Sequence, residues 1–212
     1  MEKKLDISVI SPVFNELENL ETFVESVTEV MNSTNMSWEL IIIDDGSDDG
    51  SSKILKKIGH QENIRSILLS KNYGQTTAIQ AGFDNAVGEY FVTLDSDLQN
   101  DPKDIPTLIQ KLTNEELDLV VGWRKDRKDN YFFRNLPSIL ANKLIGTITG
   151  VKLHDYGCSL KAYRAEVLKE VKLYGEMHRF IPAWMATKIP ASKISEIEAV
   201  SYTHLRAHET TN

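Results

Sequence analysis

The chain has 212 residues, of which 41% are hydrophobic, so it can bury the core of one α/β domain, with at most a small appendage. Its net charge of −7 argues against a general nucleic-acid-binding surface, and its one cysteine excludes an internal disulfide. No signal peptide is evident, and no stretch reaches the roughly 18 apolar residues of a transmembrane helix. We therefore expect a soluble or at most membrane-associated protein.

Strand and helix patterns alternate along the first part of the chain. Continuous apolar runs predict five strands, at residues 7–13, 38–43, 64–69, 90–94 and 117–122. Helical spacing of apolar residues predicts the helices between them, at residues 15–32, 51–58, 76–87 and 105–112. Near-continuous apolar strands that alternate with helices indicate a Rossmann-like α/β fold, with a mostly parallel central sheet and helices on both faces.

The pattern weakens after Arg124. We expect a charged loop at residues 125–134 and, beyond it, helices at 136–150, 165–171 and 180–187. Strands are expected at the end of residues 155–164 and at 194–200. No linker interrupts the chain, so residues 1–200 are interpreted as one domain. Residues 201–212 have no periodicity and few apolar side chains, and we expect a non-native or disordered tail there.

Polar residues gather where the predicted strands end. The first strand runs into residues 12–16, the second into 44–47, the fourth into 95–97 and the fifth into 122–124. Ligands of open α/β sheets bind beyond the carboxyl ends of the parallel strands. The sequence therefore predicts a binding site at this edge of the sheet.

Two aspartates one residue apart, Asp95 and Asp97, end the fourth strand. Where the chain turns, both carboxylates can converge on one point, and like charges that close raise a pKa unless a cation lies between them. Oxygen ligands favour Mg²⁺ or Mn²⁺, and Mg²⁺ keeps few protein ligands and completes its shell with water and substrate phosphates. The pair is thus suited to a metal-bound diphosphate, although a pair of solvated turn residues is the alternative.

Other motifs are open to two interpretations each. Asp44-Asp45-Gly46-Ser47 is either a turn or helix cap or a carboxylate site for a base N–H group. Lys71-Asn72-Tyr73-Gly74 is either a plain loop before a helix or the source of a cation for a phosphate. Arg124 forms either a surface ion pair or a diphosphate contact, and His178 is either structural or part of the site.

The order of these pieces is more specific than any one of them. The stretches that carry it are SPVFNELENL, IIIDDGSDDG, LLSKNYGQTTAIQAGFDNAVGEY, TLDSDLQNDP, VVGWR, HDYGCSLKAYR and YGEMHRFIP. From about Leu5 to Val200 the chain resembles the family 2 glycosyltransferases with the GT-A fold. Within that family it is similar to the polyprenyl-phosphate glycosyltransferases, such as dolichol-phosphate mannosyltransferase and the bacterial undecaprenyl-phosphate glucosyltransferases.

The resemblance implies roles for individual residues. The nucleotide-sugar would be bound by Pro12, Phe14, Glu16, Asp44, Asp45, Lys71, Asp95, Ser96 and Gln99. The metal, Mg²⁺ or Mn²⁺, would be held by Asp95, Asp97 and Gln99. The catalytic residues would be Asp155, Asp97 and Arg124, with Asp155 at a position where the family carries an acid near the acceptor.

The resemblance also implies the reaction. A hexosyltransferase of this kind would move a sugar from a UDP- or GDP-linked donor to a polyprenyl phosphate, with inversion, at the cytoplasmic face of the cell membrane. An acceptor phosphate is already anionic, so Asp155 would orient the acceptor or metal more than act as a base. The family's basic Arg-x-x-Gly-x-Ser-Lys segment is missing, since SYTHLRAHET stands there. We expect that segment, and transmembrane helices beyond it, to have been lost with the natural C-terminus.

Three alternatives compete with this interpretation. A family 2 enzyme that extends a glycan at a sugar hydroxyl would need a genuine base, and the absence of a Gln-x-x-Arg-Trp motif argues against it. A phosphorylation-dependent receiver module would carry its paired acids after the first strand, where this chain reads PVFNE. The third alternative is an inactive nucleotide-sugar-binding fragment. The sugar, the nucleotide base and the oligomeric state are left open.

Overall fold

The computed structural model describes most of the chain. The described residues are 5–125, 146–147, 149–168 and 171–202. Most of the loop expected at 125–134, most of the helix expected at 136–150 and residues 203–212 of the expected tail lie outside them. Ser201 and Tyr202 are described: Ser201 forms a bridge with Asn100, and the Tyr202 hydroxyl donates to Asp101.

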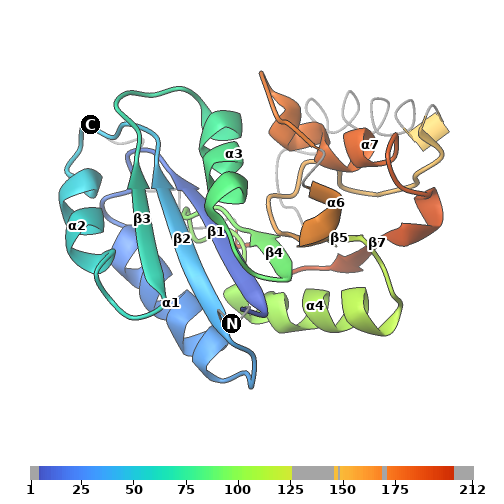
Figure 1. Ribbon diagram of the computed structural model, residues 1–212, viewed down its shortest axis with the longest axis horizontal. Coiled ribbons are helices and arrows are strands. Elements are labelled where there is room, and N and C mark those ends of the chain that lie inside the picture. The colour runs from blue at the N-terminus through green and yellow to red at the C-terminus, as the bar shows by residue number, and fades with distance from the viewer. Residues whose placement is uncertain (1–4, 126–145, 148, 169–170, 203–212) are drawn as a thin grey trace.

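The core of the fold is one mixed sheet, which has seven strands in the described residues (Figure 1). The strands are β1 Ile7–Val13, β2 Trp38–Asp44, β3 Ile64–Leu68, β4 Tyr90–Thr93, β5 Leu119–Trp123, β6 Lys161–Arg164 and β7 Ile194–Glu198. Their order is β3-β2-β1-β4-β6-β5-β7, and β6 alone pairs antiparallel, with β4 and β5. The carboxyl ends of the other strands therefore share one edge, and the predicted α/β fold with a mostly parallel sheet is confirmed.

Helices cover the sheet on two sides. The helices of the described residues are α1 Leu20–Asn32, α2 Ser51–Ile58, α3 Gln75–Asn85, α4 Ile105–Asn114, α6 Ala165–Leu168 and α7 Ile181–Met185. Short 3₁₀ turns lie at η1 Pro102–Asp104, η2 Met177–Phe180 and η3 Ala191–Lys193. In Figure 1, α3, α6 and α7 lie above the sheet, whereas α1 and α4 lie along its lower side.

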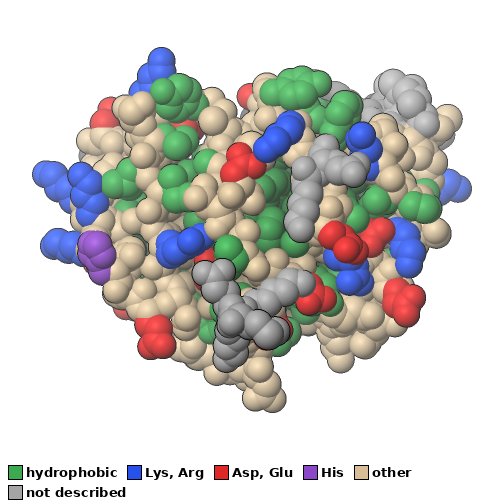
Figure 2. Space-filling view, in the orientation of Figure 1, with side chains coloured by type: hydrophobic (Ala, Val, Ile, Leu, Met, Phe, Trp, Pro, Cys, Tyr) green, Lys and Arg blue, Asp and Glu red, His purple; other side chains and the backbone are tan. Residues whose placement is uncertain are grey.

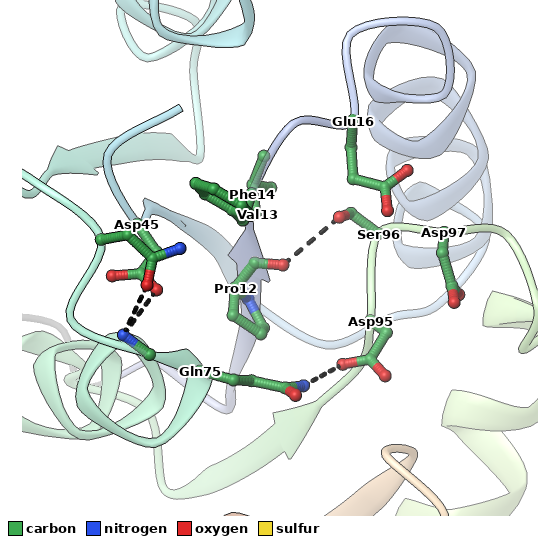
Figure 3. Close-up of a pocket in the computed structure, with 11 residues that line it drawn as sticks. Pro12, Val13, Phe14, Glu16, Asp45, Gln75, Asp95, Ser96 and Asp97 are labelled. Carbon is green, nitrogen blue, oxygen red and sulfur yellow. Dashed lines mark hydrogen bonds between the residues drawn. The ribbon is translucent and has the colours of Figure 1, made fainter. Parts of the chain in front are cut away.

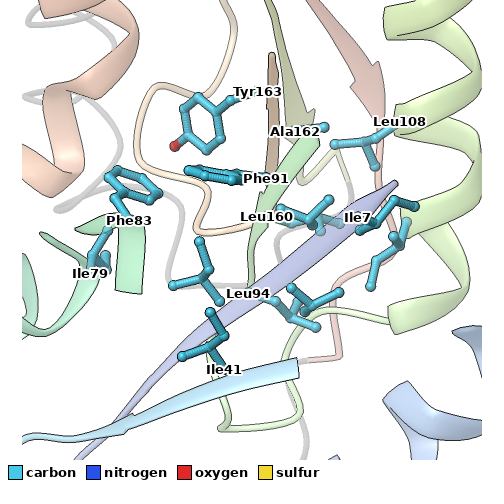
Figure 4. Packing of buried hydrophobic residues seen from close by; sticks show 14 of the residues in the cluster. Ile7, Ile41, Ile79, Phe83, Phe91, Leu94, Leu108, Leu160, Ala162 and Tyr163 are labelled. Carbon is cyan, nitrogen blue, oxygen red and sulfur yellow. The ribbon is translucent and has the colours of Figure 1, made fainter. Parts of the chain in front are cut away.

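Close packing fixes α3 over the centre of the sheet. A Cβ atom on Gly82 would lie 2.3 Å from Ile10 Cγ2 of β1, so only glycine allows this approach. Beside it, the Phe83 ring stacks on Phe91 and meets Tyr163 edge-on, with ring centroids 5.9 Å and 5.7 Å apart (Figure 4). This packing places the first turn of α3 at the carboxyl edge of the sheet, next to the end of β4.

The first helix begins later than the sequence pattern predicts. It starts at Leu20 instead of Asn15, because Asn15 has a left-handed φ of 56°. The Asn15 side chain donates to Asp48 and accepts from the Asp48 backbone N–H, and the Asn15 backbone N–H donates to Ser47. These bonds join the chain after β1 to the chain after β2, so two strand ends form one rim.

Candidate active site

A cavity of about 280 Å³ opens at the carboxyl ends of β1, β2 and β4 (Figure 3). It lies where the sequence predicts a site, and most of the expected nucleotide-sugar residues line it together with Asp97. These are Pro12, Phe14, Glu16, Asp45, Asp95, Ser96 and Asp97. Four of these side chains are carboxylic acids, so the cavity is strongly acidic and suits a cation or a cation-bound ligand.

The two aspartates after β4 line the cavity together. The Asp95 carboxylate accepts a 2.7 Å bond from Gln75 Nε2, and Asp97 accepts a 3.1 Å bond from the Gln99 backbone N–H. Between them, the buried Ser96 hydroxyl donates to the Pro12 carbonyl at 3.3 Å and ties β4 to β1. Burial raises the pKa of Asp95, and the charge of Asp97 raises it further, which indicates two carboxylates under mutual repulsion.

These residues fit a hard divalent cation. The donors are oxygens, and two carboxylates on one strand end repel each other without a cation. No cluster of three or more histidine, cysteine or acidic residues suited to a metal ion occurs in the described part of the chain. A site with two protein carboxylates suits Mg²⁺ or Mn²⁺, which complete their shells with water and phosphate oxygens, better than zinc.

The repulsion leads to a stability prediction for the metal-free protein. An acid whose pKa is raised holds its proton more tightly in the folded state, so stability is lost as pH rises from its unfolded value through the folded one. At pH 7, Asp95→Asn is therefore expected to raise the melting temperature in EDTA. Mn²⁺ is expected to raise the melting temperature of the unsubstituted chain but not that of the variant.

Differential scanning fluorimetry checks both expectations. The matched control is Glu25→Gln, which removes an exposed carboxylate of α1 that does not line the cavity. It should leave the Mn²⁺-induced shift intact. An Asp95→Asn variant that melts lower in EDTA and keeps the full shift would contradict the assignment of repelling, metal-binding carboxylates.

The two aspartates at the carboxyl end of β2, Asp44 and Asp45, face different partners. Asp44 accepts bonds from the Ser47 backbone N–H and the Ser52 hydroxyl, so it caps the turn and does not line the cavity. Asp45 lines the cavity and also accepts the backbone N–H groups of Tyr73 and Gly74, each at 2.8 Å. Of the two interpretations of this motif, Asp44 therefore matches the turn, and Asp45 stands at the cavity.

Two other predicted donor-site residues lie off the cavity wall. The Lys71 ammonium is 5.2 Å from the centroid of the Tyr73 ring, in a cation–π contact. Gln99 contributes its backbone: the N–H bonds Asp97, and the carbonyl accepts from Tyr202. Their roles toward a ligand stay predictions.

The predicted catalytic residues Arg124 and Asp155 form one closed ion pair. Arg124 donates to both Asp155 oxygens, from Nε at 2.7 Å and from a terminal nitrogen at 3.1 Å. Their side chains are 11% and 14% exposed, so the pair is largely desolvated. Burial lowers the pKa of Arg124, but the Asp155 contact raises it above the ordinary value, and the guanidinium stays charged. The pair does not line the cavity, although the positive charge of Arg124 acts to lower the pKa of Asp95.

Several lining residues were not assigned to the site individually from the sequence. Gln75 reaches Asp95 from the first turn of α3, and Asn72, Gly74 and Val13 complete the wall. The stretch KNYGQ contains the loop that is one candidate for a phosphate contact, but nothing in its pattern distinguishes Gln75 as a residue of the site. Only the packing of α3 on β1 brings that side chain to the end of β4.

His178 lies against the same turn of α3. Its Nδ1 is 2.6 Å from the buried Thr76 hydroxyl, and its Nε2 accepts from Arg179 at 3.3 Å. The neutral ring therefore carries its proton on Nδ1 and donates it to Thr76. Burial lowers the pKa of His178, in keeping with a neutral ring. Two further α3 side chains bond the same segment: Gln80 accepts from Leu173, and Asp84 pairs with Lys172.

The fold and the cavity define a class of α/β proteins that bind a ligand at the carboxyl edge of the sheet through paired acids. Residues 8–172 match the model of a protein family described as glycosyl transferase family 2. The match covers most of the chain, and the chain therefore belongs to glycosyl transferase family 2. The resemblance inferred from the sequence is confirmed at this level.

Two curated relatives are similar over most of this chain. The chain is 53% identical over 208 residues to a dodecaprenyl-phosphate galacturonate synthase of Rhizobium johnstonii, covering 97% of this chain and 61% of the relative. It is 41% identical over 192 residues to an undecaprenyl-phosphate 4-deoxy-4-formamido-L-arabinose transferase of Salmonella choleraesuis, covering 87% of this chain and 58% of the relative. The chain thus spans about three-fifths of the length of these relatives.

Solved structures confirm the GT-A fold. Glucosyl-3-phosphoglycerate synthase of Mycobacterium tuberculosis, in complex with Mn²⁺, UDP-glucose and phosphoglyceric acid, has a TM-score of 0.72 at 18% identity, covering 93% of this chain and 72% of that one. The same enzyme with UDP has a TM-score of 0.72 at 20% identity, covering 98% and 73%. At such low identity the likeness is one of fold.

Proposed function

We propose that this chain carries the donor-binding and catalytic part of a glycosyltransferase that moves a sugar from a nucleotide-sugar to a polyprenyl phosphate. The observation that carries the proposal is the cavity, where Asp95 and Asp97 share one wall with Glu16 and Asp45. An acidic cavity takes up a diphosphate only with a cation between the two, which is how nucleotide-sugars bind paired carboxylates. The names of the two curated relatives support a polyprenyl-phosphate acceptor.

The chemistry follows from charge. A divalent ion held by Asp95 and Asp97 would offset the negative charge that develops on the leaving diphosphate. The Phe14 ring, 46% exposed beside the cavity, offers an apolar face to the base of the nucleotide. The Arg124–Asp155 pair keeps a charged guanidinium at the end of β5, next to the acidic wall. The acceptor phosphate attacks the anomeric carbon in line, with inversion, and needs no strong base because its oxygen is already anionic.

Transfer into an organic-solvent phase tests this function. The chain is incubated with undecaprenyl phosphate, Mn²⁺ and radiolabelled UDP-glucose, UDP-galacturonate or GDP-mannose, and the mixture is then extracted with butanol. A polyprenyl-phosphate transferase places the label of one donor in the butanol phase, and EDTA prevents this. Label that moves onto a water-soluble sugar would instead indicate transfer to a hydroxyl. Donor binding without any transfer would indicate a nucleotide-sugar-binding fragment.

The acceptor places the reaction at a membrane surface, and we assign it to the cytoplasmic face. In the described residues, no helix is long and apolar enough to cross a bilayer. Three exposed aromatic side chains lie close together along the chain, in the segment before η2, in η2 and in α7: Tyr174, Phe180 and Trp184. Figure 2 shows hydrophobic side chains at the upper margin of the molecule, the side on which Figure 1 labels α7. Aromatic residues of this kind favour the interface between water and lipid.

Intrinsic fluorescence tests this membrane contact. Trp184 is 37% exposed whereas Trp38 is 5% exposed, so vesicles that cover η2 and α7 should shift the emission of Trp184 to the blue. The shift is expected to disappear in Trp184→Phe, and Phe180→Ser should weaken vesicle binding about tenfold through the lost apolar burial. Val87→Ser, at an exposed apolar residue beyond the end of α3, is the control. Binding that is equal in all variants would refute this contact surface.

A further inference from the structure

Lys161 is a lysine that the sequence motifs did not single out, in the middle of the sheet beside the site. It begins β6, where it pairs with Thr93 of β4 on one side and with Val121 of β5 on the other. The chain reaches Asp95 two residues after Thr93 and Arg124 three residues after Val121. The backbone of Lys161 thus lies between the two strand ends that carry the acidic wall and the Arg124–Asp155 pair.

Its side chain is buried in an unusual way for a lysine. Only 3% of the residue is exposed, and its ammonium donates a hydrogen bond to the carbonyl oxygen of Cys158. In the described part of the chain, the Cys158 carbonyl is the hydrogen-bond partner of the ammonium, and Lys161 forms no ion pair within 4.0 Å. Taking a charge out of water without a contacting counter-ion costs free energy, so a packing role alone does not account for a lysine here.

The charges around Lys161 belong to the site. Burial lowers the pKa of Lys161, and the negative charges of Asp95 and Asp155 act against that effect. In the other direction, Lys161 and Arg124 both favour the ionised form of Asp95. The peptide that accepts its hydrogen bond also belongs to the turn between Asp155 and β6. Lys161 therefore bonds to the backbone of the turn before β6, and it acts electrostatically on Asp95.

We propose that Lys161 is a positioning residue of the donor site, whose buried ammonium holds the 155–159 turn and supplies a fixed positive charge that balances the acidic cavity. This inference rests on the proposed function, because it assumes that the cavity takes a metal ion and a nucleotide diphosphate. Lys161 does not line the cavity, so it acts through Asp95 and the 155–159 turn and not by touching the donor.

The charge has opposite effects on two ligands of the same site. A fixed positive charge repels a divalent cation that binds alone to Asp95 and Asp97. The same charge attracts a nucleotide diphosphate, which adds negative charge when it binds to the metal-loaded site. Removal of the charge should therefore tighten the binding of Mn²⁺ and weaken the binding of the diphosphate. A lysine that only supports the fold would weaken both when it is replaced.

Lys161→Met tests the inference, because methionine fills similar space without the charge. Calorimetry at pH 8 measures the affinity for Mn²⁺ alone. It then measures, at saturating Mn²⁺, the affinity for UDP or GDP, whichever the unsubstituted chain binds. In Lys161→Met we expect roughly fivefold tighter binding of Mn²⁺ and roughly fivefold weaker binding of the nucleotide. Lys161→Arg should keep both affinities within about twofold, since it keeps the charge. Lys111→Met, which removes a lysine paired on the surface of α4, is the matched control and should change neither.

Each outcome decides the question. Parallel weakening of both ligands in a folded Lys161→Met, or no change in either, would overturn the inference while leaving the donor site in place. If the methionine variant does not fold, Lys161→Gln makes the same test, because its amide still donates to the Cys158 carbonyl. An unsubstituted chain that binds neither Mn²⁺ nor a nucleotide would overturn the proposed function first, and this inference with it.

Discussion

Sugar transfer by Asp97→Asn is expected to be at least about a thousandfold slower than transfer by the unsubstituted chain. Asp97 lines the cavity beside Asp95, and its amide replacement removes one of the two carboxylates that would hold the metal. A metal on the leaving diphosphate contributes several kcal/mol of transition-state stabilisation, and each 1.4 kcal/mol is a factor of about ten in rate. The rate is measured as label transferred to the lipid phase at saturating donor and Mn²⁺.

The control for this prediction is a surface acid of the same charge. Glu115→Gln removes an exposed carboxylate that pairs with Lys111 at the end of α4, and its transfer rate should match that of the unsubstituted chain. Circular dichroism confirms that both variants are folded. Asp97→Asn activity within tenfold of the unsubstituted chain would contradict the role of Asp97 in holding the metal.

The largest expected loss of stability comes from Gly46→Ala. Gly46 has a φ of +74°, and a Cβ atom there would lie 2.3 Å from the carbonyl carbon of Lys71 and 2.5 Å from the backbone nitrogen of Asn72. The left-handed backbone and the clash with backbone atoms together should cost about 3 kcal/mol of the free energy of unfolding. Because Asn72 and Gly74 line the cavity, movement of this loop should also weaken nucleotide binding.

Gly175→Ala separates the clash from the backbone conformation. Gly175 also has a positive φ, of +58°, but a Cβ atom there would meet nothing within 4 Å. Its replacement should cost only about 1 kcal/mol. Urea denaturation of the two variants gives the comparison. Equal losses at both positions would show that the approach of residue 46 to the loop at 71–74 does not hold in solution.

The parallel strands could be predicted from the sequence because each is a continuous apolar run. β1 and β2 are buried along their whole length, which leaves no other assignment for such runs. The short strand expected at the end of residues 155–164 is β6, Lys161–Arg164, but its antiparallel place between β4 and β5 could not be predicted in this way. Its four residues carry two charges and no apolar run, so the sequence does not indicate which strands they pair with.

The candidate site was predictable where residues follow a strand directly. Asp95, Asp97 and Glu16 come just after apolar strands, and the strand-end rule places them at one edge. The rule does not say which of two adjacent acids faces the cavity, because that depends on the turn. The turn after β2 directs Asp44 to Ser47 and Ser52, and leaves Asp45 at the cavity.

Residues brought in from other elements were out of reach of sequence reasoning. Gln75 contacts Asp95 only because Gly82 lets α3 approach the sheet, and Lys161 lies near Asp95 only because β6 inserts between β4 and β5. Neither residue stands in a pattern typical of a site. Such contacts depend on tertiary packing, which apolar periodicity does not encode.

Calorimetric titration of UDP, UDP-glucose, UDP-galacturonate and GDP-mannose into the chain tests the central claim most directly, first with Mn²⁺ and then with EDTA. The claim is that the cavity bounded by Asp95 and Asp97 holds a nucleotide-sugar through a divalent ion. We expect the nucleotides of one base to bind with Mn²⁺ and to lose that binding in EDTA. Nucleotide binding that is equally tight in EDTA, or no binding under either condition, would contradict it.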